Sequence, residues 1–216
     1  MTAEEIIQKI LTLRGIANLE EFFNPPAPKD IKSPFDSTPA IELIKKHIAL
    51  NNKIIIYGDY DVDGICATAI LWETLYSNYK KVFPHIPHRE SEGYGLSIKG
   101  IDHCLSLDAK LIITVDNGIV AHEQVEYIKN NSCDVIIIDH HEPDVKFPNA
   151  NVILYSKDCC ASGLAWFFSR DYLNKPLSLE LTCIATVCDL VPLTGLNRSF
   201  VKHGLEELQN TKRIGL

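Results

Sequence analysis

The sequence lacks several features that would assign it to a specialised class of protein. No apolar run reaches the length of a membrane span, and the acidic start, Met1 to Glu5, is unlike a signal peptide. The seven cysteines form no C-x-x-C pair, which argues against a zinc ribbon or a redox motif and predicts small buried thiols. A reducing, cytoplasmic compartment is the simplest setting for that usage.

Basic residues are also in the minority. Lys and Arg number 21 against 28 Asp and Glu, which gives a net charge of −7 at pH 7. This balance argues against a protein that binds nucleic acid over its whole surface, although it leaves room for a local basic groove. A polyanionic substrate would therefore need bound metal ions and a few placed cations.

Two parts are expected within the 216 residues. Residues 1–50 predict a helical attachment, with helices at 3–13, 18–23 and from Thr38 to just before Asn51, and an extended proline-rich connection at 24–37. In residues 51–216, strand and helix patterns alternate, which predicts an α/β fold: a parallel sheet with helices on both faces. The expected strands are 53–57, 80–86, 110–115, 134–139 and 151–155, with helices at 64–78, 97–106, 120–130, 163–173, 178–188 and 197–209.

The stretch from Tyr57 to Gly64 is the centre of the functional prediction. It follows the apolar run 53–56 and precedes a helical pattern, so it predicts a turn at the carboxyl end of a strand, where open α/β sheets place ligand sites. Asp59, Asp61 and Asp63 would repel one another unless a cation lay between them. A solvated acidic loop is the simpler interpretation, but the flanking strand, glycine and helix favour a divalent-cation site.

Two later strands end in residues of the same kind. Asp116-Asn117-Gly118 follows the strand expected at 110–115, and Asp139-His140-His141 ends the strand expected at 134–139. A single aspartate at a strand end is usually a helix cap. Three strands that each deliver carboxylate or imidazole to one edge of a sheet instead predict a cluster for Mn²⁺ or Mg²⁺.

These motifs resemble those of the DHH phosphoesterases, and flanking segments resemble in particular the RecJ-type single-strand-specific exonucleases of that family. The segments span nearly the whole chain: Arg14-Gly15-Ile16 with 20–25, 56–64, Arg89 with 92–96, and 185–193 with Asn197-Arg198. The resemblance implies a metal-dependent hydrolase that removes nucleotides from single-stranded DNA, 5′ to 3′, in DNA repair. It also implies that a DHHA1-like domain and an OB-type domain, both absent from this chain, or a separate partner complete the substrate cleft.

The resemblance further implies a two-metal centre. The ions are usually Mn²⁺, with Mg²⁺ as the alternative. Asp61 and Asp63 are expected to bind one ion each, and Asp116 is expected to bridge the two ions. His140 and Asp189 would complete the second metal site.

Several residues around that centre receive roles from the same resemblance. His141, the second histidine of the motif, is expected to face the substrate phosphate as a positioner or general acid. Asp139 and Arg89 are expected to take part in catalysis with it. Many members of the family have a histidine where this sequence has Tyr57, so Asp59 or water is expected to replace that ligand.

Substrate contacts are expected nearby. Arg89 could hold a phosphate oxygen through its planar guanidinium. Asn117-Gly118 is expected to head a helix, so its backbone amides could also receive phosphate. Tyr94, between two glycines, is expected either to stack on a base or to pack.

Three alternatives stay open at this stage. A DHH hydrolase of short oligonucleotides or cyclic dinucleotides would share the metal motifs. A soluble pyrophosphatase would share them too, but it leaves the RecJ-like flanks unexplained. A catalytically idle DHH-fold scaffold is the alternative from another class, and a scaffold has no need to retain mutually repelling carboxylates.

Overall fold

A five-stranded parallel sheet forms the centre of the molecule, which the computed structural model describes over residues 2–16, 18–175 and 177–216. Every neighbouring pair of strands in it is parallel. The expected α/β class and all five expected strands are confirmed, with the second strand shorter than expected. In the order β2-β1-β3-β4-β5, the strands are β2 (Val82–His85), β1 (Lys53–Tyr57), β3 (Ala109–Val115), β4 (Asp134–Asp139) and β5 (Val152–Tyr155).

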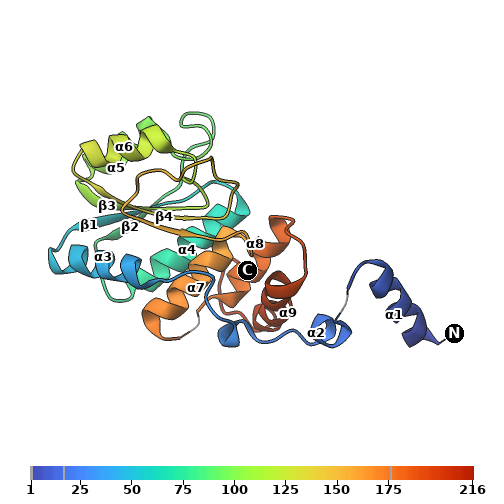
Figure 1. The fold of residues 1–216 in the computed structure, drawn as a ribbon. Helices are drawn as coiled ribbons and strands as arrows, with labels where there is room; N and C mark the ends of the chain where they lie inside the picture. Colours follow the sequence, from blue (N-terminus) through green and yellow to red (C-terminus); the bar gives the residue numbers. More distant parts are fainter. Residues whose placement is uncertain (1, 17, 176) are drawn as a thin grey trace.

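Helices cover both faces of the sheet, as expected (Figure 1). Successive side chains of a strand point to opposite faces, so Ile54 and Ile56 of β1 pack in one core and Ile55 in the other. The larger core contains side chains of α3 (Thr38–Ala49), α4 (Val62–Tyr76), α7 (Ala161–Leu173), α8 (Leu179–Cys188) and α9 (Gly195–Leu208). The smaller core contains side chains of α5 (Ile98–Ser106) and α6 (His122–Asn130).

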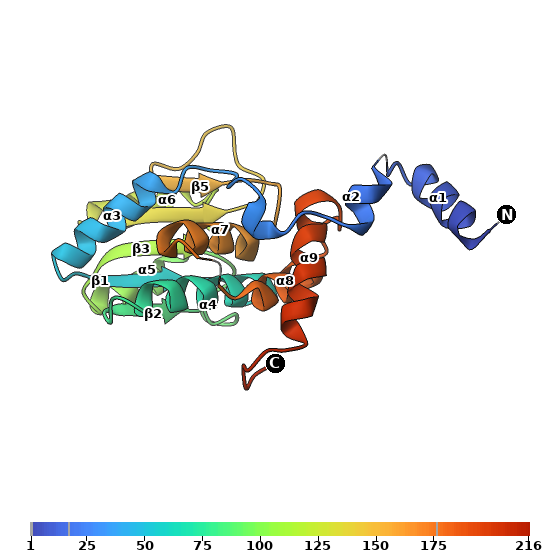
Figure 2. The same cartoon turned by 90° about the horizontal axis from the view of Figure 1, so that it is seen from below.

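The N-terminal region projects from this body (Figure 2). Its helices are α1 (Ala3–Leu13), which begins with the expected capping box, and α2 (Leu19–Phe23). The proline-rich connection contains one short 3-10 helix, η1 (Pro28–Asp30), where the sequence predicted no regular structure. The domain division at residue 50 stays a prediction, and α3, which precedes it, contributes Ala40 and Ile44 to the larger core.

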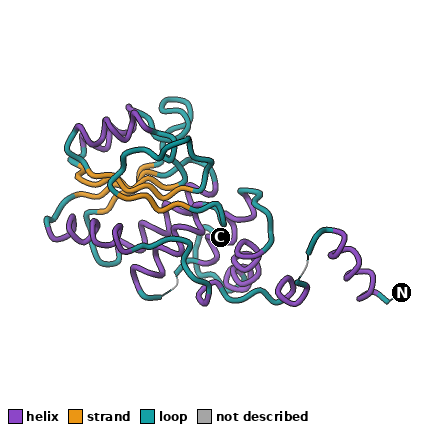
Figure 3. The backbone as a smooth tube through the Cα atoms, in the orientation of Figure 1, coloured by secondary structure: helices purple, strands orange, loops and turns teal. Residues whose placement is uncertain are grey.

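In the sheet, whose strands are orange in Figure 3, β1, β3 and β4 are consecutive neighbours. These are the three strands that the sequence singled out for their acidic and imidazole termini. Because the strands are parallel, all three termini lie at one edge of the sheet.

The sequence predicted no membrane-spanning segment and buried cysteines. In the part of the chain that the structure describes, no helix is long and apolar enough to cross a membrane. Six of the seven cysteines are buried, as expected, but Cys188 is exposed because it lies in the last turn of α8, next to the site described below.

Helices α8 and α9 approach each other closely at Gly204. A Cβ at this position would lie 2.4 Å from Cys183 Cβ and 2.9 Å from the carbonyl oxygen of Leu179. Gly204→Ala gains helix propensity but forces the helices apart, so we expect a net loss of about 1–2 kcal/mol in the free energy of unfolding. Urea denaturation followed by circular dichroism measures this loss.

Gly215→Ala is the control, because a Cβ there meets nothing within 4 Å and should leave the midpoint unchanged. An unchanged midpoint for Gly204→Ala as well would contradict the close α8–α9 contact.

Candidate metal centre

Acidic and imidazole side chains meet at the carboxyl edge of the sheet. They form three overlapping groups, and within each group the ligand atoms lie within 4.8 Å of one another. Asp116 and His140 each belong to two groups, so the three groups form one continuous cluster. The groups are Asp59, Asp61 and Asp116; Asp63, His140 and Asp189; and Asp116, His140 and His141. The structure thus brings together every residue that the sequence proposed as a metal ligand.

The backbone after β1 positions the first of these side chains. Asp61 caps α4, since its Oδ1 accepts a hydrogen bond from the amide of Gly64 at 2.9 Å. Asp63 therefore lies in the first turn of α4 rather than in a turn before the helix. A Cβ at residue 64 would lie 2.6 Å from the Asp59 amide nitrogen, so only glycine allows this close approach of the two segments.

Asp63 is held by the start of α7. Its Oδ2 accepts from the amide of Ala161 at 2.7 Å, and its Oδ1 accepts from the amide of Ser162 at 2.8 Å. The N-cap residue Cys160 makes no side-chain capping bond, so a carboxylate from α4 satisfies these amides instead. Sequence reasoning missed this support, because backbone donors 98 and 99 positions away leave no signal in residue identity.

Within the described part of the chain, several polar atoms of the cluster have unsatisfied hydrogen-bonding capacity, which indicates whether the site suits a cation. Asp59 Oδ2, Asp116 Oδ1 and His140 Nε2 are buried without a hydrogen-bond partner among the residues that the structure describes. Buried polar atoms are normally paired, and oxygen and imidazole ligands suit Mn²⁺ or Mg²⁺. His140 Nε2 lies 3.3 Å from Asp116 Oδ1 and 3.7 Å from Asp63 Oδ2. The donor set therefore fits divalent cations.

Tyr57, which stands where many DHH sequences have histidine, does not take part in the cluster. Its side chain is buried in the smaller core, with the hydroxyl 3.4 Å from the carbonyl oxygen of Gly95 and the ring 4.7 Å from that of His85. Asp59 is fully buried and lies with Asp61 in one ligand group. This is the placement that the sequence expected for a carboxylate in place of the histidine.

Asp139 holds His141 and is not in any of the ligand groups. Its Oδ1 accepts from His141 Nδ1 at 2.8 Å, and its Oδ2 accepts from the amide of Ile119 at 2.9 Å. Burial alone would raise the pKa of Asp139, but these hydrogen bonds lower it below its ordinary value. The same contact with Asp139 raises the pKa of His141. The ring is thereby oriented with Nε2 3.2 Å from the hydroxyl oxygen of Tyr94.

The remaining carboxylates are electrostatically strained in the absence of cations. Burial, followed by the nearby charges of Asp63 and Asp61, raises the pKa of Asp116 to about 11. Burial is also the main cause of a raised pKa at Asp59 and at Asp189. A bound cation would reverse this preference by favouring the ionised forms.

The expected substrate residues lie along one side of the cluster. Arg89 is in the exposed segment after β2, with its guanidinium carbon 5.3 Å from the ring centre of Tyr60. The rings of Tyr60 and Tyr94 are 6.2 Å apart, and Tyr94 reaches His141. These side chains form a row that ends at the cluster. Sequence reasoning did not single out Tyr60 for this row, because its place between two aspartates marks it only as part of the metal motif.

The prediction that Asn117 and Gly118 head a helix is wrong. Helix α6 begins only at His122, after a turn in which the amide of Ala121 donates to the carbonyl oxygen of Gly118 at 3.0 Å. Gly118 has a φ of 108°, which no helix allows. The helix-terminus argument for phosphate binding therefore does not apply. A phosphate contact at these two residues stays a prediction.

Two cavities differ in their relation to the cluster. One of about 450 Å³ is lined by Tyr94, Asn117, Asp139 and His141, together with the segment 118–121. Another, of about 870 Å³, lies between η1, α8, α9 and the C-terminal tail and contains none of the expected site residues. Of these two cavities, the smaller one borders the cluster.

Comparisons with known proteins agree with this arrangement. Residues 53–188 match the DHH family, N-terminal domain. The single-stranded-DNA-specific exonuclease RecJ of Bacillus subtilis (strain 168) is 34% identical over 98% of this chain, and that of Thermus thermophilus is 32% identical over 82%. The chain spans only 29% and 28% of those two proteins. A crystal structure of exonuclease RecJ bound to manganese is 31% identical, with a TM-score of 0.75 over 88% of this chain and 52% of that one.

Without cations, Asp116→Asn should stabilise the protein at pH 8. The folded-state pKa of about 11 lies above the ordinary value of 3.8, so the stability contributed by the protonated carboxyl is complete below about pH 4 and declines as the pH rises from there. Asparagine removes that decline, and we expect a gain of about 1–3 kcal/mol at pH 8 that fades toward pH 4. Denaturant unfolding in EDTA over this pH range measures the gain.

The control for this variant is Glu90→Gln, a change of an exposed carboxylate outside the cluster, which should leave the free energy of unfolding unchanged. An Asp116→Asn protein that is less stable than the wild type throughout the range would contradict the electrostatic account.

Proposed function

Because the chain belongs to the DHH family, we propose that it is a two-metal phosphodiesterase that acts as a RecJ-like exonuclease on single-stranded DNA, from 5′ to 3′. One observation carries the proposal: buried carboxylate and imidazole atoms that have no hydrogen-bond partner among the described residues meet at the sheet edge where the DHH motifs end. The relatives' names supply the substrate class.

We assign the ligands to two ions, either Mn²⁺ or Mg²⁺, both of which occur in crystal structures of RecJ proteins. When bound, two such ions activate a water for attack on a phosphodiester and stabilise the leaving oxygen. Asp116 shares one ligand group with Asp59 and Asp61 and another with His140, so we assign it as the ligand that bridges the two sets. The sets are Asp59 and Asp61 for one ion, and Asp63, His140 and Asp189 for the other.

His141 is the proposed catalytic side chain beside the ions. Its Nδ1 is engaged by Asp139, so its Nε2 is the nitrogen that can hold a proton at a substrate oxygen. The raised pKa of His141 favours the protonated ring, which suits a positioner of phosphate or a general acid. Asp139 acts through His141 and is a positioning residue.

The row of Arg89, Tyr60 and Tyr94 is proposed to receive the nucleic acid next to the ions. The guanidinium of Arg89 can hold a phosphate, and the exposed ring of Tyr94 can stack on a base. Because the chain spans less than a third of the Bacillus subtilis and Thermus thermophilus relatives, we propose that further domains, DHHA1-like and OB-type, or a separate partner close the cleft opposite the cluster.

Asp116→Ala should lower Mn²⁺-dependent hydrolysis of single-stranded DNA by at least about 100-fold, because Asp116 joins both ligand sets. Oligonucleotides labelled at the 5′ or the 3′ end report both the rate and the polarity. Glu90→Gln is the matched control and should retain full activity. Near wild-type turnover of the Asp116→Ala protein would contradict the assignment of Asp116 as the bridging carboxylate.

The same assay separates the alternatives when dinucleotides, cyclic dinucleotides and pyrophosphate are run in parallel. Faster turnover of one of these than of single strands would replace the exonuclease proposal with that activity. Mn²⁺ binding without turnover of any substrate would indicate a scaffold.

A further inference from the structure

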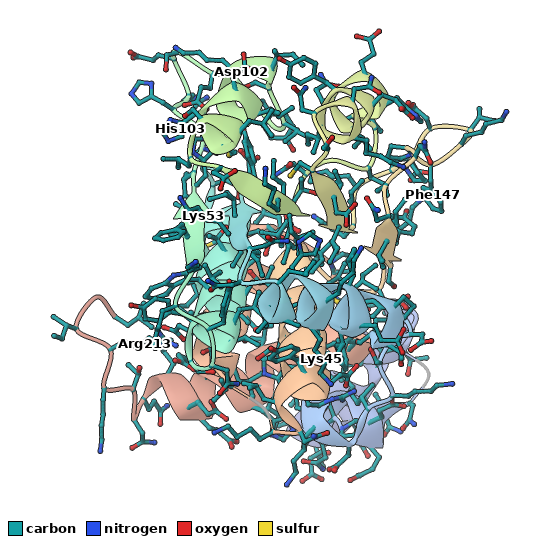
Figure 4. The ribbon with its side chains drawn as sticks, turned by 90° about the vertical axis from the view of Figure 1, so that its left-hand side faces the viewer. Lys45, Lys53, Asp102, His103, Phe147 and Arg213 are labelled. Carbon is teal, nitrogen blue, oxygen red and sulfur yellow. The ribbon has the colours of Figure 1, made fainter. Side chains whose placement is uncertain are left out.

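The C-terminal tail joins two helices at a point remote from the metal centre. Arg213, labelled in Figure 4, lies after α9 and contacts both α4 and the start of α8. Its guanidinium donates to the two carboxylate oxygens of Glu73 on α4 at 2.5 and 2.6 Å, and to Glu180 on α8 at 2.5 Å. It also donates to Ser178 Oγ at 2.7 Å. One side chain thus connects three segments of the chain.

Helices α4 and α8 run antiparallel and are connected at both ends. At the cluster, Asp63 in the first turn of α4 and Asp189 at the end of α8 belong to one ligand group. At the other end, Glu73 and Glu180 share Arg213. Glu73 lies ten residues after Asp63 and Glu180 nine before Asp189, so Arg213 acts about 14–15 Å from the cluster along both helix axes.

The electrostatic interactions at the two ends of the α4–α8 pair differ: they are repulsive at the cluster and attractive at Arg213. At the cluster, Asp63 and Asp189 are both carboxyl groups within one ligand group, and their ionised forms repel each other unless a cation lies between them. At the other end, a planar guanidinium holds two carboxylates in a fixed geometry, which a point charge such as that of Lys would not do. The side chains of Arg213, Glu73 and Glu180 are 29%, 32% and 11% exposed, so solvent screens these contacts only in part.

Apolar packing along the rest of the helix pair is favourable but not directional, so it limits sliding less than an ionic contact of fixed geometry does. We propose that Arg213 is a positioning residue for the metal centre: by fixing α8 against α4, it holds Asp189 within reach of the ion shared with Asp63. This inference rests on the proposed function only in requiring that the cluster bind divalent cations.

Isothermal titration calorimetry of the chain with Mn²⁺ measures the binding affinity and tests the proposal without relying on activity. Arg213→Ala should weaken binding at the Asp189 site by about tenfold, which is within the range by which contacts remote from a site modulate it. Arg213→Lys, which keeps the charge but not the planar geometry, should give an intermediate loss. Glu180→Gln removes the α8 half of the contact and provides a second route if Arg213→Ala does not fold.

Arg170→Ala is the matched control. Arg170 is also a partly buried arginine, but it donates to Asp171 at 3.0 Å and to the carbonyl oxygen of Ile31 at 2.7 Å, on α7 and the N-terminal connection. It should lower the melting temperature without changing the affinity for Mn²⁺.

The effect should also depend on Asp189. In an Asp189→Asn background, Arg213→Ala should cause no further loss of affinity, because the two residues act on the same ligand position. Wild-type affinity in Arg213→Ala, or an equal loss in both backgrounds, would overturn this inference alone. A wild-type chain that binds no Mn²⁺ would overturn the inference and the proposed function together.

Discussion

Repulsion among carboxylates at one edge of the sheet is the constraint on which the rest of this structure depends. Asp59, Asp63 and Asp116 are almost completely buried within one cluster, although buried like charges destabilise a fold. The raised pKa of Asp116 expresses that conflict. A fold that needed only stability would place apolar or hydrogen-bonded residues here, so the arrangement is explained by a cation that the cluster is built to bind.

The carboxylates at this edge of the sheet, in the cluster and beside it, differ in their hydrogen bonds. Asp63 and Asp139 accept backbone amides on both of their oxygens, which keeps their side chains in place without a cation. Asp59 and Asp116 each keep one oxygen without a partner among the described residues. The first pair gives the site its geometry, and the second pair leaves free ligand atoms for ions. In our proposal, Arg213 contributes to the same geometry by holding α8 against α4.

Residue patterns at the strand ends were enough to predict the centre of the site. The apolar runs before Asp59, Asp116 and Asp139 predicted three strands, and parallel strands must end at a common edge, so the cluster followed from local sequence. The prediction of a helix that begins at Asn117 was wrong, also for a local reason. Asp116 and Gly118 adopt positive φ values, and the turn they form delays α6 to His122.

Contacts between distant segments could not be predicted in this way. The amides of Ala161 and Ser162 that hold Asp63 are backbone groups, which every residue but proline carries. Arg213 lies more than 130 residues from Glu73, and only the packed helices bring the two together. Tyr57 is a further example. The sequence showed that tyrosine stands in place of the family's histidine, but only the structure shows that the ring of Tyr57 packs in the smaller core.

We propose that this cluster holds two cations. Crystals grown with Mn²⁺ and measured at the manganese absorption edge test it most directly. The account predicts two anomalous peaks on opposite sides of Asp116, one beside Asp59 and Asp61 and the other among Asp63, His140 and Asp189. A single peak, or peaks elsewhere on the molecule with none at Asp116, would contradict it.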